Sequence, residues 1–439
     1  MTAQLRVLSI YEGFFSGGAR ILHSDVLSGL HGRRGQQHSL LSIHQEMHRE
    51  ATLQPMQHDA CYRRLVADGV TVSTLGRGAR DRAEYSAAEL AQVSGLVSRS
   101  DVVITLKEQP LGLLNRAELH GRPVIACLHR SDPDNQGGAL TELREAAATG
   151  RLAAAVCCAE SARAAYLAAG IPAELLHVIP NGVDLRRFRP SGRARAAVRA
   201  EFGIPEQAPT VVFAARYDGM KNVPLFLAAA SRLFELRPDA HVLLCGAGMT
   251  AANPALLRDL AERGLAAPAR RSQGPAGAGA GAGRGRPVPD ARIHLLGVRE
   301  DPEAVFAAAD VVALTSSFGE AAPLCLIEGL LCGAVPVATD VGDCAAIVDG
   351  HGLIAAPQPE ALAEAWLEAL ARRPQFLQLS RHTRHRFGRA RMIGAYGALI
   401  RRTHRGAGRL APLSKGSVTL AAAGRGAPPP AVRGALPVA

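Results

Sequence analysis

Lysine is almost missing from this sequence. Lys107, Lys221 and Lys415 are its only lysines among 50 basic residues, and all the others are arginine. In a chain so biased toward arginine, each lysine calls for an explanation. Aromatic residues make up only 4% of the chain and no nucleic-acid-binding motif occurs. Because base-stacking side chains are scarce, we expect no nucleic-acid partner.

The sequence also lacks membrane-spanning and disulfide signals. No apolar run approaches the roughly 18–20 residues of a membrane span, and no signal-peptide pattern opens the chain. The eight cysteines form no CxxC pair, and half of them (Cys127, Cys245, Cys325 and Cys332) lie in apolar segments. We therefore expect buried free thiols and a cytoplasmic protein.

Apolar segments alternate with helical stretches along the whole chain, which indicates βαβ units and parallel sheets. With 439 residues, 48% of them hydrophobic, the chain can bury two cores. The predicted fold class is α/β, with two Rossmann-like, doubly wound domains facing a central cleft. Strands are expected over 5–10, 38–43, 70–75, 101–106, 123–128, 153–158 and 176–179, and then over 210–215, 240–245, 292–296, 310–315, 335–339 and 353–355.

Composition suggests the domain boundaries. We expect an N-terminal domain over 1–185, a linker over 186–208 and a C-terminal domain over 209–380. The Gly- and Ala-rich residues 268–289 should form a flexible insertion. A helix over 381–405 should pack back on the domains, followed by a disordered basic tail over 406–439.

The net charge of +11 is concentrated at the end of the chain. From Arg372 onward there are 14 Arg and Lys residues and no Asp or Glu, so the rest of the chain is net negative. Such a region could contact an anionic membrane surface. The alternative is a solvated basic helix and tail.

Two carboxylates, Glu320 and Glu328, follow the expected strand 310–315. The segment from Pro323 to Cys332 has a helical pattern, with Pro323 suited to the first turn and Gly333 to the exit. Glu320 should therefore lie in a strand-to-helix loop, where open α/β sheets bind ligands. Glu328 should lie about a turn and a half into the helix.

Several motifs occur in order along the chain. They are Ser16-Gly-Gly-Ala19, Pro180-Asn-Gly-Val-Asp184, Arg216-Tyr-Asp-Gly-Met-Lys221, the pair Glu320 and Glu328, and Pro336-Val-Ala-Thr-Asp-Val-Gly342. Together this set resembles the retaining glycosyltransferases of family 4, the group-1 transferases with the GT-B fold. The resemblance covers about residues 5–402 without the insertion, and it is strongest over 292–348.

The resemblance implies a catalytic role for four residues. Arg216 and Lys221 would stabilise the charge that develops on the leaving diphosphate. Glu320 would hold or orient the donor sugar. His129 would position the donor, although a buried, hydrogen-bonded structural histidine is the alternative. Lys107 follows another strand and is a further candidate for the same cleft.

The resemblance also implies a set of donor-binding residues. Glu328 would bind the ribose hydroxyls, and Gly17 and Gly18 would lie over the diphosphate, because glycine lets the backbone approach closely. Sugar hydroxyls or phosphate would meet the backbone near Ala321, Ala322 and Leu324, and secondary nucleotide contacts would come from Gly246 and Gly248.

The activity implied is transfer of a hexosyl group, with retention, from a nucleoside diphosphate sugar to a glycan, a lipid-linked acceptor or a small molecule. No metal or other cofactor is expected. A nucleotide-sugar 2-epimerase of the same architecture is one alternative. A non-catalytic protein that binds a nucleotide sugar or an anionic lipid is another.

Three other patterns resemble known motifs only superficially. Gly246 to Ala251 fits a loose dinucleotide-binding pattern but lacks the acidic residue expected about twenty positions later. Asp132-Pro-Asp134 resembles a metal-binding DxD clamp, and His44 to His48 resembles HExxH without matching it. We expect an ordinary loop at Asp132–Asp134, and no metal site at His44–His48, because that segment follows a strand and does not lie on a long helix.

Overall fold

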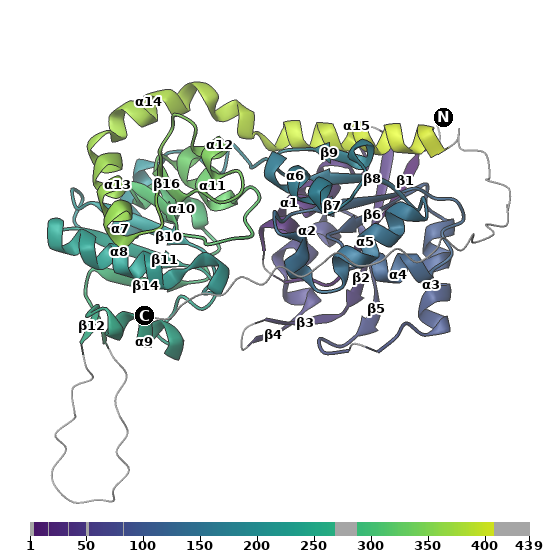
Figure 1. The fold of residues 1–439 in the computed structure, drawn as a ribbon, viewed down its shortest axis with the longest axis horizontal. Helices are drawn as coiled ribbons and strands as arrows, with labels where there is room; N and C mark the ends of the chain where they lie inside the picture. The colour runs from purple at the N-terminus through teal and green to yellow at the C-terminus, as the bar shows by residue number, and fades with distance from the viewer. Residues whose placement is uncertain are drawn as a thin grey trace, which may run out of the picture.

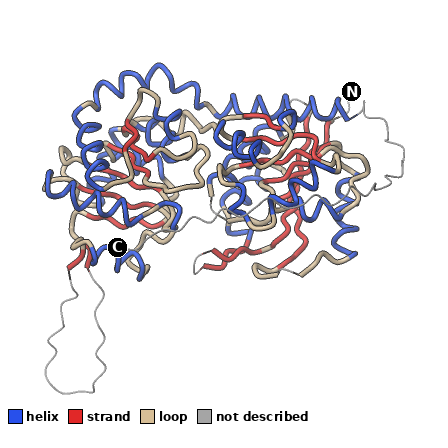
Figure 2. The backbone as a smooth tube through the Cα atoms, in the orientation of Figure 1, coloured by secondary structure: helices blue, strands red, loops and turns tan. Residues whose placement is uncertain are grey.

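The computed structural model describes residues 4–407 apart from residues 16, 34, 50–51, 82 and 268–287. Each half of the chain forms an open sheet of parallel strands, and helices cover both faces of each sheet (Figures 1 and 2). The predicted α/β class with two Rossmann-like domains is therefore confirmed. The predicted tail and most of the predicted insertion lie outside the described residues.

The first domain is built on seven strands in the order β5-β2-β1-β6-β7-β8-β9. The strand order reverses between β1 and β6, so the loops after these strands flank a crevice at the carboxyl edge of the sheet. All seven were predicted to within two residues at each end. Their bounds are β1 Leu5–Tyr11, β2 Gln36–His44, β5 Thr71–Arg77, β6 Val102–Leu106, β7 Val124–Leu128, β8 Leu152–Cys157 and β9 Leu176–Val178.

The second domain repeats this arrangement with six strands in the order β14-β11-β10-β15-β16-β17. Here the order reverses between β10 and β15, which places the loops after these two strands on either side of the crevice. The bounds are β10 Thr210–Ala214, β11 His241–Cys245, β14 Ile293–Gly297, β15 Val311–Leu314, β16 Val335–Thr339 and β17 Leu353–Ala355.

Helices form the outer layers of both domains. Those of the first domain are α1 Gly18–Leu30, α2 Ala60–Ala67, α3 Ala87–Ser98, α4 Leu111–Arg116, α5 Ala139–Ala148 and α6 Glu160–Ala168. Those that follow are α7 Gly192–Glu201, α8 Val223–Leu236, α9 Pro254–Glu262, α10 Pro302–Ala308, α11 Leu324–Cys332, α12 Cys344–Val348, α13 Pro359–Ala371, α14 Arg373–Thr383 and α15 Arg389–Ala407. Short 3₁₀ turns are η1 Met56–His58, η2 Pro133–Gln136, η3 Ala173–Leu175, η4 Gly219–Lys221 and η5 Arg384–Phe387.

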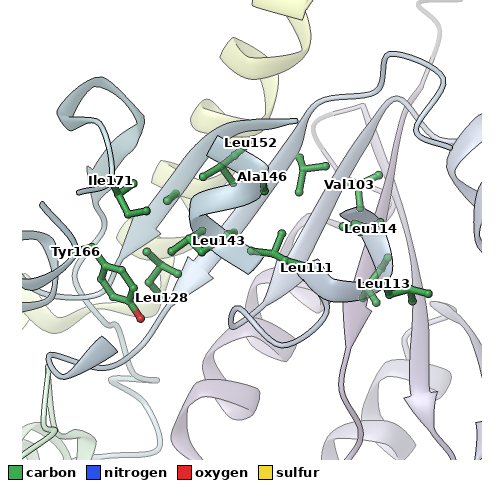
Figure 3. Close-up of a cluster of buried hydrophobic side chains, with 14 of the residues drawn as sticks. Val103, Leu111, Leu113, Leu114, Leu128, Leu143, Ala146, Leu152, Tyr166 and Ile171 are labelled. Carbon is green, nitrogen blue, oxygen red and sulfur yellow. The ribbon is translucent and has the colours of Figure 1, made fainter. Parts of the chain in front are cut away.

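The central strands are buried on both faces. Every residue of β6, β7, β15 and β16 is buried, which explains why these segments read as unbroken apolar runs. Figure 3 shows one layer of this core, where Leu111, Leu143 and Tyr166 from three helices pack beside strand residues. On the other face of the first sheet lies the last helix, α15, which buries Tyr396 and Ile400 (Figure 1).

The chain passes between the domains twice, and the two passages pair with each other. Val183 N donates to Phe387 O at 2.8 Å, and Arg389 N donates to Val183 O at 2.9 Å. A Cβ atom at Gly182 would lie 2.9 Å from Gly388 O, so only glycine allows this backbone contact. The Pro180–Asp184 motif therefore forms part of the connection between the domains.

The structure differs from the sequence-based plan in three respects. The expected helix over 381–405 is observed as the end of α14, the turn η5 and helix α15, which begins at Arg389. The expected linker over 186–208 includes helix α7, which packs on α10 and buries Val198 in the second domain. This segment is therefore part of that domain. Two short antiparallel hairpins had no signal in the sequence, namely β3 Glu46–Arg49 with β4 Thr52–Pro55, and β12 Ala266–Ala267 with β13 Val288–Pro289.

Gly182→Ala tests the paired passages. The added methyl group must displace backbone atoms of Gly388 and Arg389. We therefore expect the free energy of unfolding to fall by about 1–3 kcal/mol, the usual cost of overpacking. Thermal unfolding followed by circular dichroism measures it. Gly192→Ala is the matched control, because a Cβ there meets nothing within 4 Å. An unchanged melting temperature for Gly182→Ala would contradict this account of the connection.

Candidate active site

Lys221 and Glu320 form a largely buried ion pair at the carboxyl edge of the second sheet, where its strand order reverses. Lys221 ends the turn η4 after β10, and Glu320 lies in the loop after β15. Lys221 Nζ contacts Glu320 Oε1, which also accepts a hydrogen bond from Ser316 Oγ at 2.6 Å. Glu320 is only 6% exposed. Lys221, which we expected at the diphosphate, and Glu320, which we expected at the donor sugar, thus form one ion pair.

Backbone hydrogen bonds fix the two loops that carry this pair. Thr315 Oγ1 donates to Lys221 O at 3.0 Å, and Ser317 N donates to Met220 O at 2.9 Å. Asn222, in the left-handed conformation, caps helix α8 through Leu225 N. The position of Lys221 is therefore set by both loops and by the start of α8.

Arg216 lies on the same loop as Lys221, but its side chain is more exposed to solvent. Its guanidinium forms an ion pair with Asp218 at 3.2 Å, and both side chains are 32% exposed. Asp218 also caps η4 by accepting a hydrogen bond from Met220 N at 2.9 Å. Arg216 is thus a partly exposed cation on the same loop as Lys221.

Gly246 and Gly248 fit against the loop of Arg216. Both have positive φ, and a Cβ at Gly246 would lie 2.1 Å from Ala215 O. Tyr217 N donates to Ala247 O at 2.8 Å, which joins the loops after β10 and β11. These glycines therefore have a structural reason to be present, whether or not they also touch a nucleotide.

Glu328 is a half-buried carboxylate on α11 with an unusual acidity. Burial raises the pKa of Glu328 to about 8, and the positive charge of Arg187 lowers it only in part. Within the described residues it has no hydrogen-bond or ion-pair partner. Burial of a charged carboxylate without a partner is costly, so the neutral acid is favoured unless a ligand supplies hydrogen-bond donors.

The backbone of the residues after Glu320 is bound both from within the second domain and from the first domain. Ala321 O accepts from Asp343 N at 2.8 Å, and Ala322 O accepts from Asn181 Nδ2 at 2.9 Å. These two carbonyl oxygens thus have protein partners, and the donor contacts expected from the backbone near Ala321, Ala322 and Leu324 stay a prediction.

The Gly-rich turn of the first domain faces the start of α11. Gly17 precedes α1 and its carbonyl accepts from Arg20 N at 3.1 Å. A Cβ at Gly18 would lie 3.0 Å from Leu324 Cδ1. The structure therefore brings the first predicted motif next to the helix of the glutamate pair.

His129 lies at the end of β7, in the first domain. Burial, together with the charge of Lys107, lowers the pKa of His129 to about 3, so the ring is neutral at physiological pH. Its buried Nε2 has no hydrogen-bond partner among the described residues. Lys107 has a positive φ of 68°, which is strained for a residue with a side chain.

The superficial motifs have ordinary structural roles. Arg130 donates to Asp132 at 2.6 Å, so this carboxylate is neutralised by a neighbouring guanidinium. His44 ends β2, and His48 lies in the hairpin strand β3, so the two do not share a helical face. Among the described residues no three His, Cys, Asp or Glu side chains are grouped as metal ligands.

Sequence reasoning missed the residues that cross between the domains. Ser131 Oγ donates to Glu320 O, Asn181 reaches Ala322, and Asp343 reaches the start of α6. Ser131 and Asn181 do lie next to predicted features, the His129 strand end and the Pro180 turn. Their partners, however, are more than 140 residues away in the sequence, at separations of 189 and 141.

Comparisons with known proteins point to one family. The family described as Glycosyltransferase Family 4 matches residues 31–187, and that described as Glycosyl transferases group 1 matches residues 277–372. Together the two matches span more than half of the chain. None of the helices in the described part of the chain is both long and apolar enough to cross a bilayer.

Curated relatives match over part of their length. The D-inositol 3-phosphate glycosyltransferase of Saccharomonospora viridis is 32% identical over 210 residues, which is 45% of this chain and 42% of that protein. That of Corynebacterium jeikeium is 30% identical over 190 residues, 40% of each chain. The chain thus spans about two fifths of the length of these relatives.

Solved structures match over almost the whole fold. Anabaena Alr3699/HepE in complex with UDP has a TM-score of 0.70 at 19% identity, covering 91% of this chain and all of that one. WaaG, a glycosyltransferase involved in lipopolysaccharide biosynthesis, has a TM-score of 0.58 at 16% identity, covering 87% of this chain and 95% of that one. At these identities the likeness concerns the fold, and it confirms the predicted GT-B architecture.

Glu328→Gln should raise the melting temperature at pH 8 more than at pH 5. The folded-state pKa of about 8 lies above the usual carboxyl value of about 4.3, so wild-type stability falls as pH rises between these values. Glutamine does not titrate, so the Glu328→Gln protein should not lose stability in this way as the pH rises. Thermal unfolding at both pH values is the measurement, with Glu364→Gln, an exposed carboxylate on α13, as control. A Glu328→Gln protein less stable than wild type at pH 8 would refute the pKa assignment.

Proposed function

Because this chain belongs to the group-1 glycosyltransferases of family 4, we propose that it transfers a hexosyl group from a nucleoside diphosphate sugar to an acceptor. In this proposal the transfer retains the anomeric configuration and needs no metal. The observation that carries the proposal is the buried Lys221–Glu320 pair at the point where the second sheet reverses its strand order.

In this proposal, charged groups of the site stabilise the leaving diphosphate. Cleavage of the anomeric C–O bond leaves negative charge on a diphosphate, which fixed cations in a dry site stabilise strongly. In the proposal, Lys221 and Arg216 take this role from one loop. The free N–H groups at the start of α11, which has no side-chain cap, add a favourable dipole.

Glu320 and Glu328 bind different parts of the donor in this proposal. Glu320, held by Lys221 and Ser316, orients the sugar hydroxyls. Glu328, desolvated and without a protein partner, accepts hydrogen bonds from the ribose hydroxyls. Gly17, Gly18 and neutral His129 close the site from the first domain.

The donor and acceptor follow from the relatives only as first candidates. Solved structures of Alr3699/HepE contain UDP or UDP-glucose, so UDP sugars are the first donors to test. The curated relatives are named D-inositol 3-phosphate glycosyltransferases, so inositol phosphates belong in an acceptor panel beside glycans and lipid-linked sugars. We place the acceptor on the first domain, beyond His129.

Neither alternative function gains support from the structure. An epimerase and a non-catalytic binding protein share this fold in principle, but the matched families and relatives are glycosyltransferases. Product analysis separates the three, because an epimerase returns an intact nucleotide sugar and a binding protein changes nothing.

We further propose that the basic C-terminal region brings this enzyme to an anionic membrane from the cytoplasm. Arg391, Arg402 and Arg405 are exposed on α15. Arg402 also lines a surface hollow of about 480 Å³ together with Arg163, His177 and the acidic Glu160. Anionic lipid headgroups attract basic residues near the membrane surface by about 1 kcal/mol per residue.

Lys221→Ala and Glu320→Ala should each reduce transfer by at least about 100-fold, the usual effect of losing one transition-state contact. Release of nucleoside diphosphate from UDP, GDP and ADP sugars, with EDTA present, is the measurement. Arg232→Ala is the control, since this exposed arginine lies on α8 after the same loop. Circular dichroism checks that each variant is folded. Full activity in either site variant would overturn its assigned role.

The double variant Arg402→Ala with Arg405→Ala should bind phosphatidylglycerol vesicles more weakly, by about 2 kcal/mol for two removed charges. Vesicle sedimentation at low salt is the measurement, with phosphatidylcholine vesicles and the Arg232→Ala protein as controls. Salt at about 0.5 M should abolish binding, because exposed charges are then screened. Equal binding to both lipids would count against the membrane proposal.

A further inference from the structure

Helix α6 begins without a cap of its own. Its first residue is Glu160, and the preceding Ala159 has no side-chain oxygen to accept hydrogen bonds from the first turn. Ala159 nevertheless has the extended backbone that is usual for an N-cap residue, with φ −156° and ψ 158°. The sequence of the first domain thus leaves the start of this nine-residue helix unsatisfied.

Asp343 of the second domain supplies the missing cap. Its Oδ2 accepts from Glu160 N at 3.0 Å, and its Oδ1 accepts from Ser161 N at 2.9 Å. A negative charge at this end of a helix is also favoured by the helix dipole. The Asp343 carboxylate, which lies 183 and 182 residues from Glu160 and Ser161 in the sequence, therefore caps α6 in place of a local residue.

The same residue supports the loop that carries Glu320. Asp343 N donates to Ala321 O at 2.8 Å. The preceding Gly342 allows this close approach, because a Cβ there would lie 2.1 Å from Glu320 O. The backbone of Asp343 is thus bound to the glutamate loop, while its carboxylate is bound to the other domain.

Neighbouring contacts place this link within a larger domain interface. Ala321 and Ala322 pack against the apolar core of the first domain. Ser131 Oγ donates to Glu320 O, and Asn181 Nδ2 donates to Ala322 O at 2.9 Å. Each of these contacts would be lost if the domains moved apart. Asp343 differs from the other residues named here, because its side chain caps α6 while its backbone binds the Glu320 loop.

We propose that Asp343 is a positioning residue that couples closure of the two domains to the placement of Glu320. Closure gives α6 its cap and fixes the Glu320 loop at the same time. Opening exposes the first turn of α6 to water and removes the contacts that the first domain makes with the loop. The kinetic consequence rests on the proposed function, whereas the structural coupling does not.

Hydrogen exchange tests the structural coupling. Asp343→Ala should speed exchange of the peptides that contain Glu160–Ser161 and Glu320–Ala322 by about five- to thirty-fold, the factor for losing one helix cap. Asp343→Asn should fall between wild type and Asp343→Ala, because the amide oxygen can replace one acceptor of the carboxylate whereas the amide NH2 cannot accept from the second backbone N–H. Asp340→Ala is the control, since Asp340 is exposed on the same turn. Unchanged exchange of the Glu320–Ala322 peptide in Asp343→Ala would overturn the proposal.

A second variant separates helix capping from domain coupling. Asp343→Ala combined with Ala159→Ser gives α6 a cap from its own chain, so exchange at Glu160–Ser161 should return toward wild type. The Glu320–Ala322 peptide should stay fast, and kcat for nucleotide release should stay about five- to thirty-fold low. Recovery of kcat in this double variant would show that Asp343 is only a helix cap and would refute the coupling. Absence of nucleotide release in wild type would refute the proposed function alone, because the exchange data would still decide the coupling.

Discussion

The buried ion pair between Lys221 and Glu320 constrains the rest of the site. Desolvating two charges costs several kcal/mol per ion, and only close contact and further hydrogen bonds offset that cost. The loops after β10 and β15 meet this demand together: Ser316 donates to the carboxylate, and Thr315 donates to the backbone of Lys221. A change in either loop would leave a charge buried without its partner. The glutamate loop must therefore be held firmly, and much of its support comes from the other domain.

That support makes the domain interface part of the site. Ser131, Asn181 and Asp343 bind the backbone at Glu320, Ala322 and Ala321, respectively. The paired passages at Val183 and Gly388 hold the two domains near each other, so such contacts cost little chain entropy. Glu328 shows the opposite arrangement, since it is desolvated and has no partner among the described residues. The structure thus satisfies the backbone of the loop and leaves one carboxylate available to a ligand.

Strands and motif positions were readable from the sequence because they rest on local rules. All thirteen strands of the two parallel sheets were predicted, since fully buried strands appear as short apolar runs between helical stretches. Helix α11 was expected over 323–332 and is observed as Leu324–Cys332, with Gly333 in the left-handed exit conformation. The hairpin β3–β4 and helix α7 were not predicted. Their short or arginine-rich segments carry little periodic signal.

By itself, the sequence determined the fold class, the order of the strands along the chain, the loops that carry Arg216, Lys221 and Glu320, and the helix that carries Glu328. Periodicity and turn residues act over a few positions, and these features need nothing more. Only the tertiary structure decided that Lys221 pairs with Glu320, that Glu328 has a pKa of about 8, and that Asp343 caps a helix of the other domain. Burial and hydrogen bonding between residues 99 or 183 positions apart depend on how the sheets pack, which no local pattern encodes.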